Sequence, residues 1–392
     1  MIDSILVGMT GLQGFSKGLR VIANNTANID TPGFKASTLQ FADLFYSTSS
    51  PGTGSGLMQV GYGLDTGGTS LDFKQGELRQ TGNTLDLALD GQGLFTLKDA
   101  DGNIHYTRAG QFMFNADGVL VNRADGSKVM GMDANGVMGE ISIKGEGTLE
   151  GKATTTVTFS GNLPSTSASQ TVQGVTVIDS VGGTHDLSVK LTASTTDPGH
   201  WTVELLDGSA SFAAGEIAFV DGMPDPAQSK VSVTYKPAGL ADVPLTLDFS
   251  ADVTSFDSQD LSTLAFRSQD GYAPGALTGV SFDDTGTLVM SYANGQTEKG
   301  SQLALGRFDS LDAVKSVGGN AFDNTNSLAW HVGVAGGNGF GKVRSGMVEL
   351  SNVDLSQEFS DLVIMQRGYQ ASSQVISTAN EMLQELFTMK NK

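Results

Sequence analysis

Cysteine is absent from the 392 residues, so disulfide bonds, thiolate metal sites and thiol nucleophiles are all excluded. Histidine is nearly absent: only His105, His185, His200 and His331 occur, far apart in the chain and each beside strand-like residues. We therefore expect partly exposed strand histidines rather than a catalytic or metal-binding cluster. The sequence predicts no cofactor and no metal site.

Basic residues are also scarce, at 23 against 42 acidic ones, which gives a net charge of −19. A chain this negative is repelled by nucleic acid and by anionic lipid. No apolar run approaches the roughly 18 residues of a membrane span, and the N-terminus lacks the basic and apolar blocks of a cleaved signal peptide. We therefore expect neither nucleic-acid binding nor membrane insertion.

Two short stretches imitate the sites of enzymes or metal-binding proteins. Gly336, Gly341 and Lys342 have the spacing of a phosphate-binding loop, but Val343 stands where that loop needs a Ser or Thr hydroxyl. The stretch 99–103 has the composition of a calcium loop without its glycine or its bidentate acid, and a hairpin turn explains it better. The sequence predicts that the protein is not an enzyme, although a site assembled from distant segments stays open.

Glycine is frequent, with 51 residues, and it separates short stretches of alternating polarity that are typical of β-strands. The alternation is clear at 187–191, 231–235 and 245–249. The segment 146–275 is therefore predicted to be an antiparallel β-sandwich or barrel. Further β patterns on both sides, 65–145 and 276–354, predict one discontinuous β domain into which the central block is inserted.

Each end of the chain has a helical pattern instead. Apolar residues near the N-terminus recur at alternating intervals of three and four, which predicts an amphipathic helix of about 25 residues. Near the C-terminus they recur every seven residues, and Asp354 followed by Gln357 predicts a capped helix over about 355–389. The candidate interface residues on these two stripes are Ile2, Ile5, Leu6, Met9, Leu12, Phe15, Leu19, Ile22, Leu355, Phe359, Leu362, Tyr369, Ile376, Leu383 and Leu386.

Two interpretations explain what covers these apolar stripes. The helices could pair within one chain, or neighbouring copies could cover them. Gln366, Ser373 and Asn380 interrupt the C-terminal seam, and polar seam positions reduce the stability of an isolated pair. We therefore expect association between copies. The predicted fold class is mostly β with terminal α-helices that form a coiled-coil-like core, and the predicted parts are a helical assembly domain (1–30 and 355–392), a linker (31–64), the discontinuous β domain and the insertion.

The residues next to both helices resemble those of a known family. The stretches 23–28 (Ala-Asn-Asn-Thr-Ala-Asn) and 31–35 (Thr-Pro-Gly-Phe-Lys) are similar to the N-terminal signature of the bacterial flagellar rod and hook protein family, although Thr26 replaces its usual branched aliphatic residue. The stretches 351–358 and 366–371 are similar to its C-terminal signature. The matching motif residues are Asn24, Asn25, Asn28, Thr31, Gly33, Phe34, Asn352, Asp354, Gln366, Arg367 and Tyr369.

The resemblance implies a subunit that polymerises with copies of itself. Rod-type members are shorter and lack a central domain, so the length implies the hook branch: a flexible tube that transmits torque from rod to filament. The implied partners are rod, hook-cap and hook–filament junction proteins and the type III export apparatus, and the implied location is the hook and basal body, extracellular after export. The alternatives are a distal rod protein with an insertion and a surface-binding β module, for which Trp201, Phe212, Phe219 and Tyr235 are the candidate residues.

Overall fold

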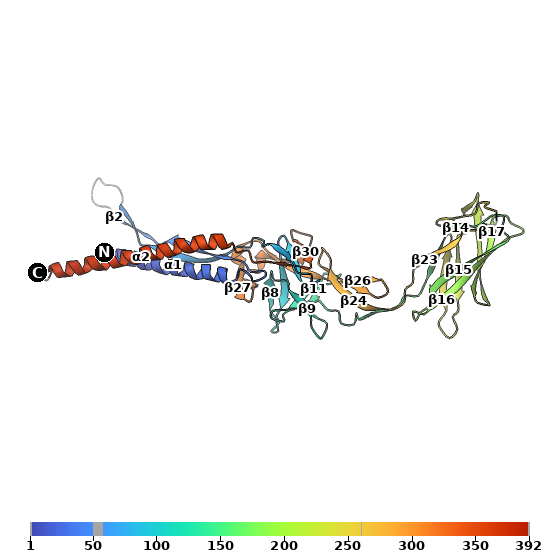
Figure 1. Ribbon diagram of the computed structural model, residues 1–392, viewed down its shortest axis with the longest axis horizontal. Coiled ribbons are helices and arrows are strands. Elements are labelled where there is room, and N and C mark those ends of the chain that lie inside the picture. Colours follow the sequence, from blue (N-terminus) through green and yellow to red (C-terminus); the bar gives the residue numbers. More distant parts are fainter. Residues whose placement is uncertain (1, 50–57, 260, 391–392) are drawn as a thin grey trace. The chain divides into compact units, whose positions relative to one another are not determined.

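The computed structural model describes residues 2–49, 58–259 and 261–390, without the side chains of 2, 47–49, 58–60, 214, 312 and 390 (Figure 1). The glycine-rich stretch 52–56, which falls within the segment predicted as a linker, lies outside the described residues. The chain forms two compact units. The first unit comprises Met1–Lys144, Val280–Val289 and Lys299–Lys392, and the second unit comprises Gly145–Gly279 and Met290–Glu298.

The two helices of the first unit are α1, Ile2–Ala27, and α2, Leu355–Lys390, which confirms the predicted terminal helices. The carboxylate of Asp354 caps α2 by accepting hydrogen bonds from the backbone N–H groups of Ser356 (2.8 Å) and Gln357 (3.2 Å). The Gln357 side chain donates to Asp361 at 3.0 and 3.1 Å. The N-cap therefore forms, and the Gln357 amide is used one turn further along the helix. Neither helix of the described chain has the length and apolar character needed to cross a membrane.

The strands of the first unit are β1 Ser37–Asp43, β2 Tyr46–Ser49, β3 Met58–Gly61, β4 Leu64–Leu71, β5 Leu78–Gln80, β6 Leu87–Asp90, β7 Leu94–Lys98, β8 Ile104–Thr107, β9 Phe112–Phe114, β10 Leu120–Asn122, β11 Lys128–Met132, β12 Met138–Glu140, β27 Val314–Gly318, β28 Ala321–Asn324, β29 Trp330–Val334, β30 Lys342–Ser345 and β31 Met347–Glu349. Two 3₁₀ turns, Leu311–Ala313 and Ser327–Ala329, lie among them. Three strands are divided between the units along the chain: β24 Gly275–Phe282, β25 Thr287–Tyr292 and β26 Thr297–Phe308.

The main sheet of the first unit joins segments that are far apart in the sequence. Its strands follow the order β26-β11-β7-β8-β28-β27, so three strands from 94–132 lie between strands from 297–324. The predicted hairpin of β7 and β8 is antiparallel, and Asp99 closes its turn by accepting a 2.7 Å hydrogen bond from the Asn103 N–H. Leu94, Tyr106, Phe322 and Trp330 form part of the core beside it. The stretch 99–103 is thus a hairpin turn.

The second unit is a sandwich of two sheets around one apolar core. One sheet has the order β20-β21-β14-β22 with β23 beside β14, and the other has the order β15-β16-β17-β18-β19. Its strands are β13 Thr148–Leu149, β14 Thr156–Asn162, β15 Ser169–Ile178, β16 Thr184–Ala193, β17 His200–Asp207, β18 Ala210–Val220, β19 Met223–Pro224, β20 Lys230–Tyr235, β21 Val243–Asp248, β22 Val253–Thr254 and β23 Ala265–Gln269. The predicted sandwich is present and most of its strand pairs are antiparallel, but β14 departs from the prediction, because it runs parallel to both β21 and β22. A strand can lie beside a distant strand of either direction when a long connection separates them.

The aromatic residues considered for a binding surface lie inside this sandwich. Trp201, Phe219 and Tyr235 are buried in its core, and Phe212 is half-buried against it. Buried rings cannot contact a ligand at the surface. The apolar area that they bury stabilises the sandwich instead. The observation that would favour a surface-binding β module is therefore missing.

A histidine on β8, between β7 and β28, generates a pH prediction. His105 contacts two carboxylates, Asp323 through Nδ1 and Asp99 through Nε2 at 3.0 Å. Partial burial disfavours the charged imidazolium, but the hydrogen bonds to Asp323 and Asp99 outweigh it and raise the pKa of His105. The contribution of this cluster to the free energy of unfolding is complete below about pH 6.5, the unfolded pKa, and is lost as pH rises through the higher folded pKa.

We expect the free energy of unfolding of the native chain to fall relative to that of His105→Gln between about pH 6 and pH 9. Urea denaturation of both proteins across this range measures the difference. Thr202→Gln, at an exposed position of the second unit, is the control and should keep the native pH dependence. Parallel curves for the native chain and His105→Gln would contradict the assignment.

Candidate assembly site

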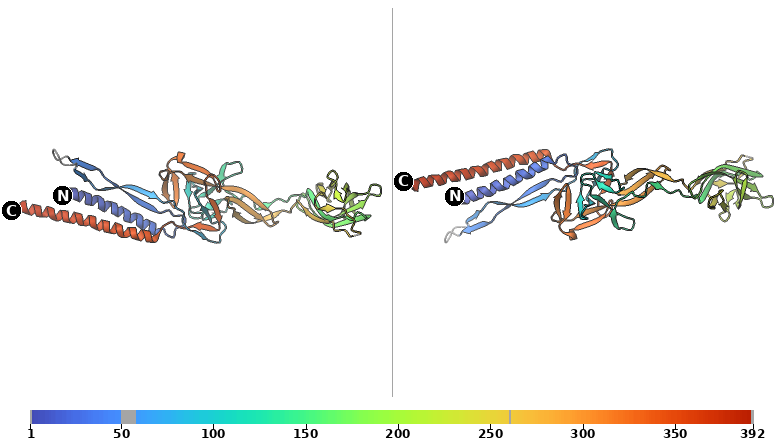
Figure 2. Two further views of the ribbon diagram at one scale, coloured as in Figure 1. Left: turned by 90° about the horizontal axis from the view of Figure 1, so that it is seen from above. Right: turned by 90° about the horizontal axis from the view of Figure 1, so that it is seen from below.

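The two terminal helices lie side by side, as both views in Figure 2 show. Glycines on α1 allow the close approach. A Cβ atom at Gly8 would lie 2.8 Å from Ile376 Cγ1, and one at Gly11 would lie 2.6 Å from Ser372 Oγ. On the opposing helix, a Cβ atom at Gly368 would lie 2.6 Å from the ring of Phe15. The helices therefore pair within the chain, the interpretation that the sequence had left as the alternative.

Pairing buries only part of the two stripes. Of the predicted interface residues, Ile22 is buried; Ile5, Leu12, Phe15, Leu19, Leu362, Ile376 and Leu383 are half-buried; and Leu6, Met9, Leu355, Phe359, Tyr369 and Leu386 are exposed. The side chain of Ile2 lies outside the described ones. The seven-residue stripe is thus divided between the seam with α1 and the outer surface.

The exposed part of α2 carries more apolar residues than the sequence prediction included. Phe359 is 54% exposed, Ile364 60% and Phe387 66%, and Val363, Val375, Met382 and Met389 are exposed with them. We call the exposed apolar residues of both helices the outer stripe: Leu6, Val7, Met9, Leu355, Phe359, Val363, Ile364, Tyr369, Val375, Met382, Leu386, Phe387 and Met389. An exposed apolar surface of this kind is a candidate site of association.

The segment predicted as a linker, 31–64, contains β1, which packs along α1 and pairs antiparallel with β4, the strand that begins at the end of this segment. The ring of Phe41 lies 5.9 Å from that of Phe15, and a Cβ atom at Gly14 would lie 2.5 Å from Leu64 Cδ1. Two grooves follow α1. One, of about 520 Å³, is lined by Lys17, Arg20 and residues of β1 and β4, and the other, of about 300 Å³, by Leu12, Arg20 and Tyr369. The surface around α1 therefore has grooves as well as exposed apolar residues.

Asn25 connects both helices to the start of β1. It is 1% exposed, and its Nδ2 donates to the Ser37 carbonyl and to Glu358 Oε1, both at 2.8 Å, while its Oδ1 accepts from the Ser37 N–H at 3.0 Å. Burial raises the pKa of Glu358, and the hydrogen bond from Asn25 opposes that rise. One asparagine side chain thus satisfies groups from α1, α2 and β1, which explains why this residue type suits this position.

The other N-terminal motif residues shape the turn after α1. Asn28 Nδ2 donates to the carbonyl of Asn24 at 2.8 Å, and Thr31 Oγ1 donates to Asn28 Oδ1 at 3.1 Å. Gly33 has φ +72°, and a Cβ atom there would lie 2.5 Å from the backbone nitrogen of Ala109. Phe34 is half-buried and its N–H donates to the Thr31 carbonyl. Position 33 therefore requires glycine, because its backbone angle is positive and a side chain there would have no space.

Asn352 makes the corresponding link before α2. Its Oδ1 accepts from the Ala36 N–H at 2.8 Å, and its Nδ2 donates to the carbonyls of Asp72 (2.7 Å) and Lys74 (3.1 Å). Three chain segments distant in sequence are held by this amide. Gln366, Arg367 and Tyr369 lie instead on exposed positions of α2, beyond this junction.

A buried ion cluster lies at the same junction. Glu349, 0% exposed in its side chain, contacts Lys35 Nζ at 2.6 Å and Arg108 Nε at 2.5 Å. Lys35 Nζ also donates to the Lys74 carbonyl, and the Gly76 N–H donates to Glu349 Oε1. Burial lowers the pKa of Lys35, although the charge of Glu349 opposes that shift. The cluster joins the connector after α1, the β7–β8 region and β31.

Sequence reasoning missed Glu349 and the helix glycines. Glu349 is a lone charge between Val348 and Leu350, directly before the C-terminal motif, and a charge inside a short apolar strand was its only signal. Gly8, Gly11, Gly14 and Gly18 interrupt a good helical pattern at intervals of three and four residues. This spacing places them on one helix face, which was the available signal for a close helix contact.

Comparison with known proteins identifies the family. Residues 5–35 match the family described as flagella basal body rod protein, residues 88–173 the flagellar hook protein FlgE/F/G D1 domain, and residues 344–389 the flagellar basal body rod FlgEFG protein C-terminal. Flagellar hook protein FlgE of Escherichia coli K12 is 31% identical over 415 residues, covering 97% of this chain and 98% of the relative. The chain belongs to the flagellar hook protein family.

Further relatives agree with this assignment. Flagellar hook protein FlgE of Borreliella burgdorferi is 29% identical over 443 residues, covering 100% of each chain. The crystal structure of Helicobacter pylori flagellar hook protein FlgE2 aligns with a TM-score of 0.51 at 14% identity, covering 68% of this chain and 99% of that chain, which supports the fold. The protein is a structural subunit of the flagellar hook, part of a polymer in the flagellum, and it serves motility.

The glycine seam generates a prediction for the helix pair. We expect Gly8→Leu to separate α1 from α2, because the added side chain must displace Ile376. Amide hydrogen exchange in both helices should become at least about tenfold faster, although leucine is the better helix former. Ser4→Leu, at an exposed position of the same helix, is the control. Unchanged exchange in Gly8→Leu would show that the seam does not hold the helices.

The buried cluster generates a second prediction. Glu349→Gln leaves the Lys35 and Arg108 charges buried with no carboxylate between them. We expect the free energy of unfolding of the first unit to fall by about 3 kcal/mol. Glu140→Gln is the control, because Glu140 is partly exposed beside Lys98 and Lys128 and should cost less than about 1 kcal/mol. Urea denaturation compares the two, and equal losses would refute a special role for Glu349.

Proposed function

We propose that the chain polymerises through its terminal helices into a flexible tube, a universal joint that transmits torque from the flagellar rod to the filament. The outer stripe carries this proposal, because it stays exposed after α1 and α2 have paired. Each Å² of apolar surface covered by a neighbouring copy contributes about 25 cal/mol to association. Copies packed side by side cover what one chain leaves exposed.

The proposed interface combines the interface residues predicted from the sequence with the outer stripe. Leu6, Met9, Leu355, Phe359, Tyr369 and Leu386 belong to both sets, so their exposure supports the contact. The grooves beside α1 add positions where a neighbour's side chains can be received, and Lys17 and Arg20 line them. We assign the intramolecular seam to holding the helix pair and the outer stripe to holding copies together.

Bending requires a second kind of contact. Apolar helix contacts resist separation, because every lost contact re-exposes area to water, whereas polar and hydrated surfaces can slide with small changes in energy. We propose that the discontinuous β domain and the inserted β domain touch neighbouring copies through polar, hydrated contacts that can slide. The net charge of −19 supports this, since copies repel one another at distances within the roughly 8 Å screening length of physiological salt.

We further propose the division into a helical assembly domain (1–30 and 355–392), a connecting segment (31–64), a discontinuous β domain (65–145 and 276–354) and an inserted β domain (146–275). The separate packing of the second unit supports this division, although the second unit also includes 290–298. Insertion within one hairpin of a host domain keeps both attachment points close together.

The proposed partners are other copies of the chain, rod proteins, the hook cap, the hook–filament junction proteins and the type III export apparatus. Passage through an export channel requires an unfolded chain, and the absence of cysteine means that no disulfide has to be broken first. We place the assembled protein outside the cell, as part of the hook. No catalytic step or cofactor is part of this proposal.

A pair of substitutions on the outer stripe tests the proposal. We expect Phe359→Ser with Leu386→Ser to abolish polymerisation while leaving the monomer folded, because these side chains are 54% and 50% exposed in the single chain. Sedimentation measures the polymer fraction, electron microscopy its shape, and circular dichroism the monomer fold.

Val137→Ser is the matched control, since Val137 is 63% exposed and lies in the turn between β11 and β12. It should polymerise as the native chain does. Normal tubes from the helix double variant would refute the assignment of the outer stripe. A straight rather than curved polymer from the native chain would point to a rod subunit instead.

A further inference from the structure

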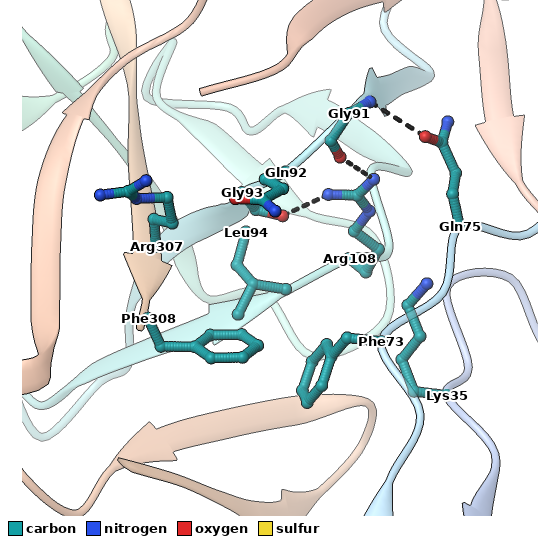
Figure 3. Close-up of a pocket in the computed structure, with 10 residues that line it drawn as sticks. All are labelled: Lys35, Phe73, Gln75, Gly91, Gln92, Gly93, Leu94, Arg108, Arg307 and Phe308. Carbon is teal, nitrogen blue, oxygen red and sulfur yellow. Dashed lines mark hydrogen bonds between the residues drawn. The ribbon is translucent and has the colours of Figure 1, made fainter. Parts of the chain in front are cut away.

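A cavity of about 310 Å³ lies in the first unit, between the connector after α1, the segment 91–94 and the end of β26 (Figure 3). Its wall has two chemically different ends. The rings of Phe73 and Phe308 lie together at one end, 4.6 Å apart between centroids, and the guanidinium groups of Arg108 and Arg307 lie towards the other. A cavity of this size fits a small organic molecule or a few side chains.

The cationic side chains of the cavity carry hydrogen-bond donors that have no acceptor among the described residues. Arg108 Nη2 donates to the carbonyls of Leu89 (2.9 Å) and Gly91 (2.6 Å), while Nη1 donates to the carbonyl of Gly93. Because each Nη carries two hydrogens, one N–H of Nη1 has no acceptor among the described residues. Lys35 likewise uses two of its three donors, on Glu349 and on the Lys74 carbonyl.

Arg307 supplies the clearest unsatisfied group. Its Nε is buried and has no hydrogen-bond partner among the described residues. The Nη2 atom lies 3.5 Å from Asp309 Oδ1, and the guanidinium carbon lies 5.9 Å from the centre of the Phe340 ring. A buried donor without an acceptor is costly, so an acceptor brought to this end of the cavity would be bound favourably.

The charges at this site favour an anion. Lys35, Arg108 and Arg307 supply three positive charges in the lining, and the carboxylates in contact with them are those of Glu349 and Asp309. The three positive charges therefore outnumber the two carboxylates that contact them by one. In a chain of net charge −19, this local excess runs against the composition.

We infer that this cavity is a binding site for a carboxylate carried on an aromatic or other apolar group. The carboxylate would accept hydrogen bonds at the end with Arg108 and Arg307, and the apolar body would lie against Phe73, Phe308 and Leu94. The carboxylate has two sources: a free small molecule, or an acidic side chain beside an apolar one on a second copy of the chain. The first source is independent of the proposed polymerisation, and the second rests on it.

The first experiment uses the full-length monomer with 4-fluorobenzoate as the probe, followed by fluorine NMR. Titration gives the dissociation constant. We expect binding that weakens about tenfold in Arg307→Gln, the effect of losing a charge-assisted hydrogen bond. Arg267→Gln, an exposed arginine of the second unit, should bind as the native chain does. The neutral probe 4-fluorobenzamide should bind at least about tenfold more weakly than the benzoate, and urea denaturation checks that each variant is folded.

The second experiment examines the polymer. A photo-crosslinking residue replaces Gln92, which is exposed and lines the cavity, and mass spectrometry identifies the captured peptide. Capture of an acidic peptide from a second copy, lost in Arg307→Gln polymer, supports the second source even when the monomer does not bind fluorobenzoate. Polymer yield is measured separately, so a failure to assemble is distinguished from an empty cavity.

Two results would overturn the inference. One is equal binding of fluorobenzoate and fluorobenzamide, or binding unaffected by Arg307→Gln, because the cavity would then select only for apolar bulk. The other is the absence of both fluorobenzoate binding to the monomer and acidic-peptide capture in a well-formed polymer.

Discussion

The buried carboxylate of Glu349 joins three segments of the first unit that the sequence keeps far apart. It lies at the end of β31, six residues before α2 begins, and it contacts Lys35 after α1 and Arg108 after β8. Two cations around one carboxylate in a dry interior are stable only in a well-defined geometry with further hydrogen bonds. The Gly76 N–H donates to Glu349, and Lys35 and Arg108 donate to backbone carbonyls, which supplies such bonds. Beside this cluster, Asn25 and Asn352 form hydrogen bonds where both helices meet the strands.

Beyond the junction, the same helices have two surfaces with different exposure to solvent. The inner surface is closed within one chain, because glycines on α1 bring Ile376, Ser372 and Met365 of α2 into close contact. The outer surface keeps large apolar residues such as Phe359 and Phe387 in solvent. In the proposed assembly, such a chain pairs its own helices and still offers exposed apolar residues to neighbouring copies. We propose that this arrangement separates the stability of one copy from the cohesion of many.

Much of the architecture was predictable because local patterns are strong in this chain. The helical stripes, the Asp354 cap and the hairpin at 99–103 each depend on residues close together in sequence, and all three appear in the structure. The motif asparagines were also identified, although only their hydrogen bonds explain them. The parallel neighbours of β14 were not predicted, since strand direction depends on how a long connection returns and not on the residues of the strand.

The sequence by itself determined where the helices lie, which of their residues are apolar, and that no disulfide or thiolate metal site stabilises the fold. Only the tertiary structure decided which half of each stripe is used within the chain, because that choice depends on glycine contacts across two helices more than 300 residues apart. It also decided that Lys35, Arg108 and Glu349 share one buried site. A charge reveals nothing in sequence about its partner, whereas burial in the folded chain requires that the partner be present.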